Sequence, residues 1–235
     1  MAIQDILLNG GSALGVVLSN VLIGIYILYK GLKLKAKLLK YAGVMIILIG
    51  MLWLGPATDF LMILTTENNI TPPEIYAFLS YIWVAPAIFI AMLIGTELIT
   101  PNKKKLILAV VAVLGVIFAI GLIFFPFDGQ TFKYELPSSP GANIIDTSFN
   151  LTFFSSWALA AILLFVIVFN GFGSVVKAKE STGILRKKFT YLAIGFIIFP
   201  IAALFDTLVP PGALLPIVRL TVVITALLLY LGLKP

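Results

Sequence analysis

The sequence of 235 residues contains no cysteine and no histidine. Without cysteine there is no disulfide, no thiolate nucleophile, no Fe–S cluster and no Cys-ligated zinc. Without histidine there is no Ser-His dyad, no HExxH zinc site, no His-ligated haem and no histidine switch near neutral pH. Only ten carboxylates remain for catalysis. We therefore expect no enzyme, no catalytic residues, no metal site and no cofactor.

Charged residues are scarce, and apolar residues are abundant. The chain is 61% hydrophobic and 11% charged, whereas a soluble domain has about 45–50% apolar and about 25% charged residues. The mean hydropathy is +1.13. So little polar surface cannot cover a compact body in water, so the apolar excess must face lipid. The composition predicts a multi-pass protein of the cell membrane.

Apolar runs of about 20 residues recur, and each is long enough to cross a hydrocarbon core of about 30 Å as a helix. The first run is not a cleavable signal peptide, because its basic residues follow it. We expect an all-α bundle of seven transmembrane helices that forms a single domain over residues 1–235. The expected spans are 11–29, 41–64, 75–98, 106–125, 151–172, 189–209 and 213–233.

The basic residues fall almost entirely on one side of the expected membrane. Fourteen of the 16 lysines and arginines follow the odd-numbered spans. Cations beside a helix are retained in the cytoplasm, so we expect the N-terminus outside and the C-terminus in the cytoplasm. Anionic lipids are expected partners. Nucleic acid is not, because the cations are split among short loops without interleaved stacking aromatics.

Three charged residues, Asp59, Asp206 and Arg219, lie inside expected spans toward their outer ends. An unpaired charge at mid-membrane costs about 2.5–3.5 kcal/mol on insertion scales. The short PPG turn before the last span makes the last two helices antiparallel neighbours, so we expect Arg219 to bridge Asp206, with Asp59 as a second candidate partner. The cluster is a ligand or ion site open to the exterior, a buried ion pair that only fixes helix register, or an arginine whose side chain snorkels outward.

The three tryptophans and one asparagine also lie inside spans, away from the interface where tryptophan gathers. They either line a cavity below the charged layer, or the tryptophans fill the bundle core while the asparagine bonds a neighbouring helix. Glu97 is expected to pair with nearby lysines at the interface. The candidate ligand-binding residues are Asp59, Asp206, Arg219, Trp53, Trp83, Trp157 and Asn20.

The connection 126–150 is the longest and is rich in Pro, Gly, Ser and Asn. A structureless connection of about 25 residues is uncommon in a compact domain. We interpret it as an outer segment that is a mobile loop, a lid or a partner-binding surface.

Two receptor families are excluded by missing motifs. The last span has no lysine for a retinal Schiff base, and the Asp-Arg-Tyr and Asn-Pro-x-x-Tyr motifs of eukaryotic class A receptors are absent. The segments GMLWLGPATDFLMIL, GFIIFPIAALFDTL and RLTVVITALLLYLGLKP together resemble a group of uncharacterised seven-helix proteins common in archaeal genomes. They are loosely similar to the membrane-embedded sensory regions that precede cytoplasmic kinase domains in prokaryotes. The resemblance associates Trp53, Asp206 and Arg219 with shared positions but carries no activity.

We therefore expect a non-enzymatic, receptor-like or ligand-binding seven-helix protein with an outward-facing polar site. The alternatives are a small-solute or lipid transporter with a 3+1+3 helix repeat and a structural protein that oligomerises through Gly11, Gly15 and Ser19. Because the sequence shows no effector domain, the resemblance implies that a signal would pass to a separate protein. The expected partners are membrane lipids, a small-molecule ligand, a second copy of the chain and a cytoplasmic signalling protein.

Overall fold

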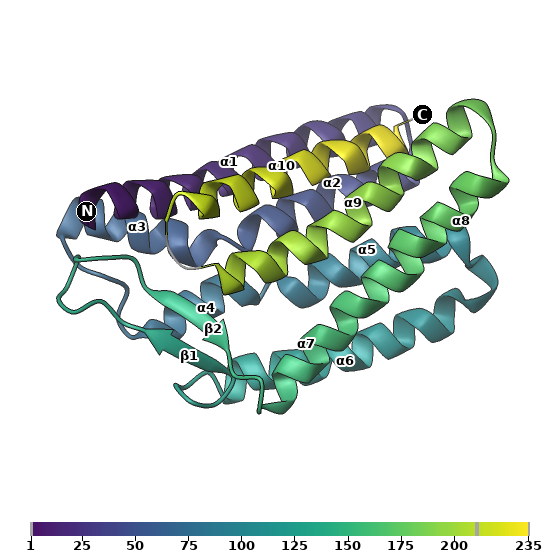
Figure 1. Ribbon diagram of the computed structural model, residues 1–235. Coiled ribbons are helices and arrows are strands. Elements are labelled where there is room, and N and C mark those ends of the chain that lie inside the picture. Colours follow the sequence, from purple (N-terminus) through teal and green to yellow (C-terminus); the bar gives the residue numbers. More distant parts are fainter. Residues whose placement is uncertain (1, 210–211, 235) are drawn as a thin grey trace.

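The computed structural model describes residues 2–209 and 212–234. Its helices run back and forth along one long direction, and Figure 1 shows the N-terminus and the C-terminus at opposite ends of the bundle. The helices are α1 (Ala2–Lys33), α2 (Lys37–Met51), α3 (Leu54–Thr66), α4 (Pro73–Tyr81), α5 (Val84–Ile99), α6 (Lys104–Phe124), α7 (Phe154–Phe165), α8 (Gly173–Glu180), α9 (Gly183–Leu208) and α10 (Leu214–Leu233), with a 3-10 turn at Pro101–Lys103 and a π-helical segment, η2, at Val166–Phe172.

Within the described residues, six helices are long and apolar enough to cross a membrane. Three of these are the single helices α1, α9 and α10; the others are α6 with its preceding 3-10 turn, α4 with α5, and α7 with η2 and α8. The pair α2 and α3 is bent by 47° and makes a seventh if it is one span. By length and composition the chain is a helical, multi-pass membrane protein.

Two of the expected spans are broken helices, and a proline explains each break. The span expected at 41–64 is interrupted at Leu52 and Trp53, between α2 and α3. Pro56 has no N–H to donate to the carbonyl of Leu52, four residues earlier, and its ring crowds that carbonyl. The span expected at 75–98 is interrupted at Ile82, which stands in the same relation to Pro86. Pro73–Ile99 is nevertheless long and apolar enough to cross a membrane as one unit, whereas the segment at 41–64 does so only if the bent pair of α2 and α3 counts as one span.

The segment 126–150 is a two-stranded hairpin, which is the exception to an all-α chain. Strands β1 (Phe132–Glu135) and β2 (Asp146–Phe149) pair antiparallel. The ring of Tyr81, at the end of α4, stacks on Phe132 with centroids 5.1 Å apart and meets Phe149 edge-on at 4.8 Å. These aromatic contacts hold the hairpin on the bundle.

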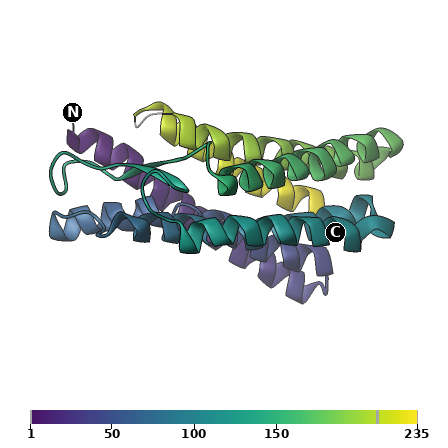
Figure 2. The same ribbon diagram turned by 90° about the horizontal axis from the view of Figure 1, so that it is seen from below.

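The two ends of the bundle differ in charge. The hairpin and the N-terminus share one end, called here the hairpin end, and Figure 2 shows them together again after rotation. The opposite, basic end holds the α1–α2, α5–α6 and α8–α9 connections and the C-terminus (Figure 1). These connections, together with the helix ends beside them, contain fourteen of the 16 lysines and arginines. There Glu97 pairs with Lys37 at 2.9 Å and with Lys104, which confirms the expected pairing.

Glycines on α1 lie on two different faces. A Cβ on Gly24 would lie 2.8 Å from the carbonyl oxygen of Gly43, so these glycines allow α1 and α2 to approach closely. A Cβ on Gly11 or Gly15 would meet nothing within 4 Å. The stripe that begins with Gly11 and Gly15 is therefore not used for packing inside the chain at these two positions.

Candidate functional site

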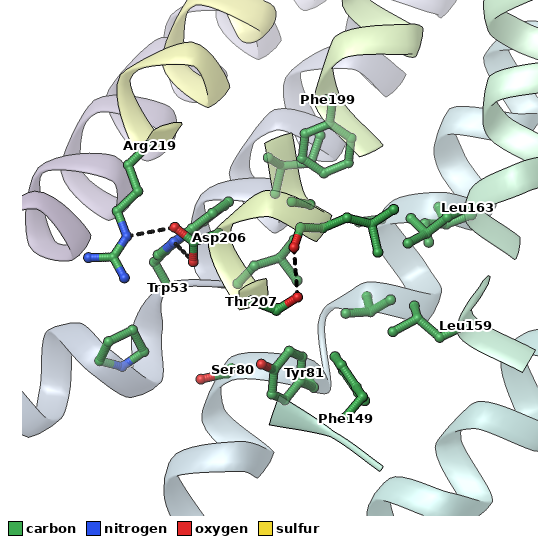
Figure 3. A pocket seen from close by; sticks show the side chains of 18 of the residues that line it. Trp53, Ser80, Tyr81, Phe149, Leu159, Leu163, Phe199, Asp206, Thr207 and Arg219 are labelled. Atoms are coloured by element: carbon green, nitrogen blue, oxygen red, sulfur yellow. Dashed lines mark hydrogen bonds and ion pairs between the residues drawn. The ribbon is translucent and has the colours of Figure 1, made fainter. Parts of the chain in front are cut away.

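A cavity of about 120 Å³ lies inside the bundle between α9 and the helices α2, α4, α5 and α7. Figure 3 shows α9 and α10 contributing Asp206 and Arg219 on one side of it, with Tyr81, Phe149 and Leu159 across from them. Most of the wall is aliphatic or aromatic, and the polar groups gather toward the hairpin end. The apolar wall includes Met45, Ile49, Ala87, Ile88, Ala91, Leu159, Leu163, Val166, Phe196, Phe199 and Leu229.

The centre of the polar end is the ion pair that the sequence predicted. Arg219 Nε donates to Asp206 Oδ1 at 2.9 Å, and both side chains are largely buried. Trp53 Nε1 donates to the other carboxylate oxygen, Oδ2, at 3.0 Å (Figure 3). Opposite charges of the last two helices therefore meet as expected, and the break between α2 and α3 places the indole of Trp53 beside them.

Arg219 also bonds α1, which the sequence reasoning missed. Its Nη1 donates to the backbone carbonyl of Asn9 and, at 2.9 Å, to Ser12 Oγ. The guanidinium thus joins α10 to α9 and α1, and its fork of donors suits several acceptors at once. The available signal was the pair of small polar residues, Asn9 and Ser12, one helical turn apart in an apolar helix.

Asp59 does not belong to this cluster, so the prediction that it could be a second partner of Arg219 was wrong. Its carboxylate is fully buried and accepts hydrogen bonds from Ile70 N at 2.7 Å, Ile145 N at 2.9 Å and Asn69 Nδ2 at 2.9 Å. The bend between α2 and α3 directs Asp59 toward the loops of the hairpin end. Asp59 therefore ties α3 to the 67–72 connection and to the hairpin.

The tryptophans do not form one set. Trp53 lines the cavity, but neither Trp83 nor Trp157 is among the described lining residues. Trp83 Nε1 donates to the carbonyl of Leu79 in α4 at 2.9 Å. Trp157 is 68% exposed on α7. The interpretation of three cavity-lining or core-filling tryptophans was therefore wrong for Trp157, which points away from the bundle.

Asn20 is buried in α1 but bonds its own helix. Its Nδ2 donates to the carbonyl of Val16 at 3.1 Å, and its Cβ lies where a side chain on Gly50 of α2 would stand. The expectation of a bond to a neighbouring helix was wrong, and Asn20 does not line the cavity. Its role is close packing of α1 on α2.

Strand β2 supplies polar groups that sequence reasoning did not include. Asp146 and Thr147 line the cavity, and the Tyr81 hydroxyl lies 3.3 Å from Thr147 Oγ1. On α9, Thr207 and Leu204 line the same region, and Leu204 is 43% exposed. The end of α9 and strand β2 therefore form the wall of the cavity at the hairpin end.

Asp146 belongs to this wall and is partly buried. Burial raises its pKa above the ordinary value of 3.8. The N–H of Thr147, which donates to Asp146 Oδ1 at 2.8 Å, lowers the pKa by less than burial raises it, and the Glu135 carboxylate opposite raises it further. The protonated form is therefore favoured at Asp146 compared with a free aspartate.

This raised pKa leads to an expected pH dependence. Folding favours the protonated carboxyl, so its contribution to stability is fully present below the unfolded pKa of about 3.9 and is lost as the pH rises through the folded value. Asp146→Asn cannot ionise, so we expect its melting temperature to rise relative to the wild type as the pH increases from about 4 to about 7. The measurement is the melting temperature of both proteins at several pH values across this range. An equal dependence of the two melting temperatures on pH would contradict a raised pKa at Asp146.

The polar end of the cavity is a paired charge cluster with no candidate metal site among the described residues. Both oxygens of Asp206 already accept hydrogen bonds, and no group of three carboxylates in residues 2–209 and 212–234 is placed to hold a metal ion. No protein family model, curated protein or solved structure matches this sequence. The cavity and its polar end are the features of the molecule that point to a function.

Proposed function

We propose that this is a receptor-like, non-enzymatic protein of the cell membrane that binds a small molecule in the cavity beside the Asp206–Arg219 pair. In this proposal α2 and α3 form the seventh span, the hairpin end faces outside and the basic end faces the cytoplasm. The collection of fourteen cations at one end supports this orientation. Membership of the archaeal seven-helix group that the sequence resembles is part of the same proposal.

The observation that carries the proposal is an apolar cavity with hydrogen-bonding groups at one end. Ligand sites are typically concave and apolar with a few placed polar groups. A cavity of about 150 Å³ lined by apolar side chains binds benzene, so the volume here, about 120 Å³, favours a ligand of about one ring or a short alkyl chain. The carboxylates of Asp146 and Asp206 favour a hydroxyl or amine donor on that ligand.

Helix α9 provides a route from this site to the other end of the bundle. It carries Asp206 near its C-terminal end and the basic residues Arg186, Lys187 and Lys188 near its start. Pro200 lies inside it and removes one backbone hydrogen bond between these two regions. A ligand that displaced Asp206 would tilt the outer part of α9 and shift the basic end, where a cytoplasmic partner would respond.

Photolabelling with a small ring compound tests the proposal. The probe is benzyl alcohol that carries a photoactivatable diazirine, which fits the expected size and has one hydroxyl donor. We expect saturable labelling of cavity-lining residues such as Tyr81, Leu163 and Phe199, reduced by excess benzyl alcohol. Ala91→Phe fills the cavity from α5 and should lower the labelling of these residues by about tenfold or more, since a loss of about 1.4 kcal/mol in binding already gives tenfold.

Ala109→Phe is the matched control. Ala109 is exposed on α6, so this substitution introduces the same side chain outside the cavity. Its labelling pattern should equal that of the wild type. If Ala91→Phe lowers the melting temperature strongly, Ala203→Phe on α9 replaces it. Labelling spread over exposed positions, without competition by benzyl alcohol, would contradict a binding site.

One observation favours transport as a second candidate function. The cavity extends to Leu229, which lies near the C-terminal end of α10 and hence toward the basic end. Transport also needs an opening on that side. Among the described residues, no lysine or arginine of the basic end lines the cavity, so binding remains the better supported function.

A further inference from the structure

A second hollow lies outside the cavity, in the groove between α8 and α9 at the basic end. It encloses about 380 Å³. Its floor and walls are aliphatic, with the buried residues Ala178 and Ala193 at the bottom. The full lining is Val175, Ala178, Lys179, Arg186, Thr190, Ala193, Ile194, Ile197 and Ile198.

Along α9 the groove changes from charged to apolar. Arg186 and Thr190 lie near the start of the helix, and Ile194, Ile197 and Ile198 follow. The distance along the helix axis from Arg186 to Ile198 is about 18 Å at 1.5 Å per residue. One leaflet of a hydrocarbon core is about 15 Å thick. The groove therefore has the length of one leaflet, with its charged part at the membrane surface.

The two cations of the groove have no carboxylate partner. Both Lys179 and Arg186 are exposed, and neither forms an ion pair with any carboxylate in residues 2–209 and 212–234. The adjacent Glu180 is already bound to Lys177 at 2.8 Å. Elsewhere at this end, by contrast, Lys37 and Lys104 are paired with Glu97. The mouth of the groove thus carries two uncompensated positive charges beside an apolar floor.

We propose that this groove binds an anionic phospholipid from the leaflet at the basic end. The phosphate lies between Lys179 and Arg186, and one acyl chain lies along Ile194, Ile197 and Ile198. Thr190 Oγ1 donates its proton to the carbonyl of Arg186 at 2.9 Å, so its oxygen is left to accept from a headgroup hydroxyl. An acidic peptide or free phosphate would use the two cations but would leave the aliphatic floor uncovered.

Native mass spectrometry of the full chain, released from detergent micelles, tests the lipid site. The probes are phosphatidylglycerol and phosphatidylcholine with equal acyl chains. We expect phosphatidylglycerol to be retained, and K179Q/R186Q to weaken its binding by about 30-fold, because each surface cation contributes about 1 kcal/mol to binding of anionic lipid. Phosphatidylcholine retention should change little. The double variant K103Q/K105Q is the control, since these exposed lysines lie at the same end and line no part of the groove.

Two further measurements distinguish binding of a whole phospholipid from binding of a phosphate group alone. Inorganic phosphate should not displace phosphatidylglycerol, and a dihexanoyl phosphatidylglycerol should bind more weakly than the long-chain lipid. Equal losses in K103Q/K105Q and K179Q/R186Q would overturn the proposal, because they would show diffuse attraction to the basic end. Displacement by inorganic phosphate, or equal binding of the short-chain lipid, would overturn it in favour of a phosphate-only site.

Discussion

Arg219→Leu is expected to destabilise the protein by about 3–5 kcal/mol, the usual cost of removing one partner of a buried ion pair. The variant leaves Asp206 with only the Trp53 N–H as a partner. It also removes the Arg219 donor from the Asn9 carbonyl and the Ser12 hydroxyl, which keep only their own hydrogen bond of 3.0 Å on α1. The loss is large because it affects three helices at one point. The measurement is equilibrium unfolding in mixed micelles, followed by intrinsic fluorescence.

Two further variants show whether the loss of stability comes from the broken ion pair. Arg186→Leu makes the same substitution at an exposed cation and should change stability by less than about 0.5 kcal/mol. D206L/R219L removes both charges, and replacing a buried pair by apolar groups is often nearly neutral, so it should recover most of the loss. If Arg219→Leu unfolds at the same denaturant concentration as the wild type, the ion pair does not stabilise the bundle.

Asp59→Asn is expected to cost about 3 kcal/mol or more. Each hydrogen bond to a charged group contributes about 1.5–3 kcal/mol, and the buried carboxylate accepts three. An asparagine retains one acceptor oxygen and turns an NH2 group toward N–H donors. The loops that Asp59 holds should therefore loosen first. Hydrogen exchange is the direct measurement, with the amides of Ile70 and Ile145 losing protection.

Glu67→Gln serves as the control for the same end of α3. Glu67 is exposed and belongs to none of the described ion pairs. Its substitution should leave the exchange of Ile70 and Ile145 unchanged. Normal protection of both amides in Asp59→Asn would show that Asp59 does not hold the loops together.

The charge pair could be predicted from the sequence because it depends on local rules. A short turn makes neighbouring helices antiparallel, and depth along each helix then places Asp206 and Arg219 near one level. Depth alone does not give the direction in which a side chain points. Asp59 has a similar depth, but the 47° bend between α2 and α3 turns it toward the hairpin end. The proline behind this bend is visible in the sequence, whereas the resulting direction is not.

The predictions for Trp157 and Asn20 were wrong for a different reason. In a water-soluble helix, polar and apolar faces show which side is buried. Here the helices are apolar all round, because lipid and the bundle core accept the same side chains. The sequence therefore does not show that Trp157 is exposed while Trp53 lines a cavity. It also does not show that Asn20 packs on Gly50 while bonding its own helix.

The hairpin was beyond sequence reasoning because its strands are short and its stability comes from distant residues. Four-residue strands such as Phe132–Glu135 give little alternation to detect. Their position depends on the ring of Tyr81 and on the hydrogen bond from Ile145 to Asp59. Both partners are far away in the sequence. The part of the cavity wall that β2 supplies therefore forms only when the helices of the bundle are packed together.

The π-helical segment η2 has a consequence for the α8–α9 groove. Asn170 within it is buried and donates from Nδ2 to the carbonyl of Ala91 on α5 at 2.8 Å. A π-helix advances by a smaller angle per residue than an α-helix, because its hydrogen bonds join residues five apart. The seven residues of η2 therefore shift the phase of every later side chain on α8. Lys179 lines the groove with residues of α9, so a change in the turn that Asn170 holds in the bundle would alter which side chain of α8 faces that groove.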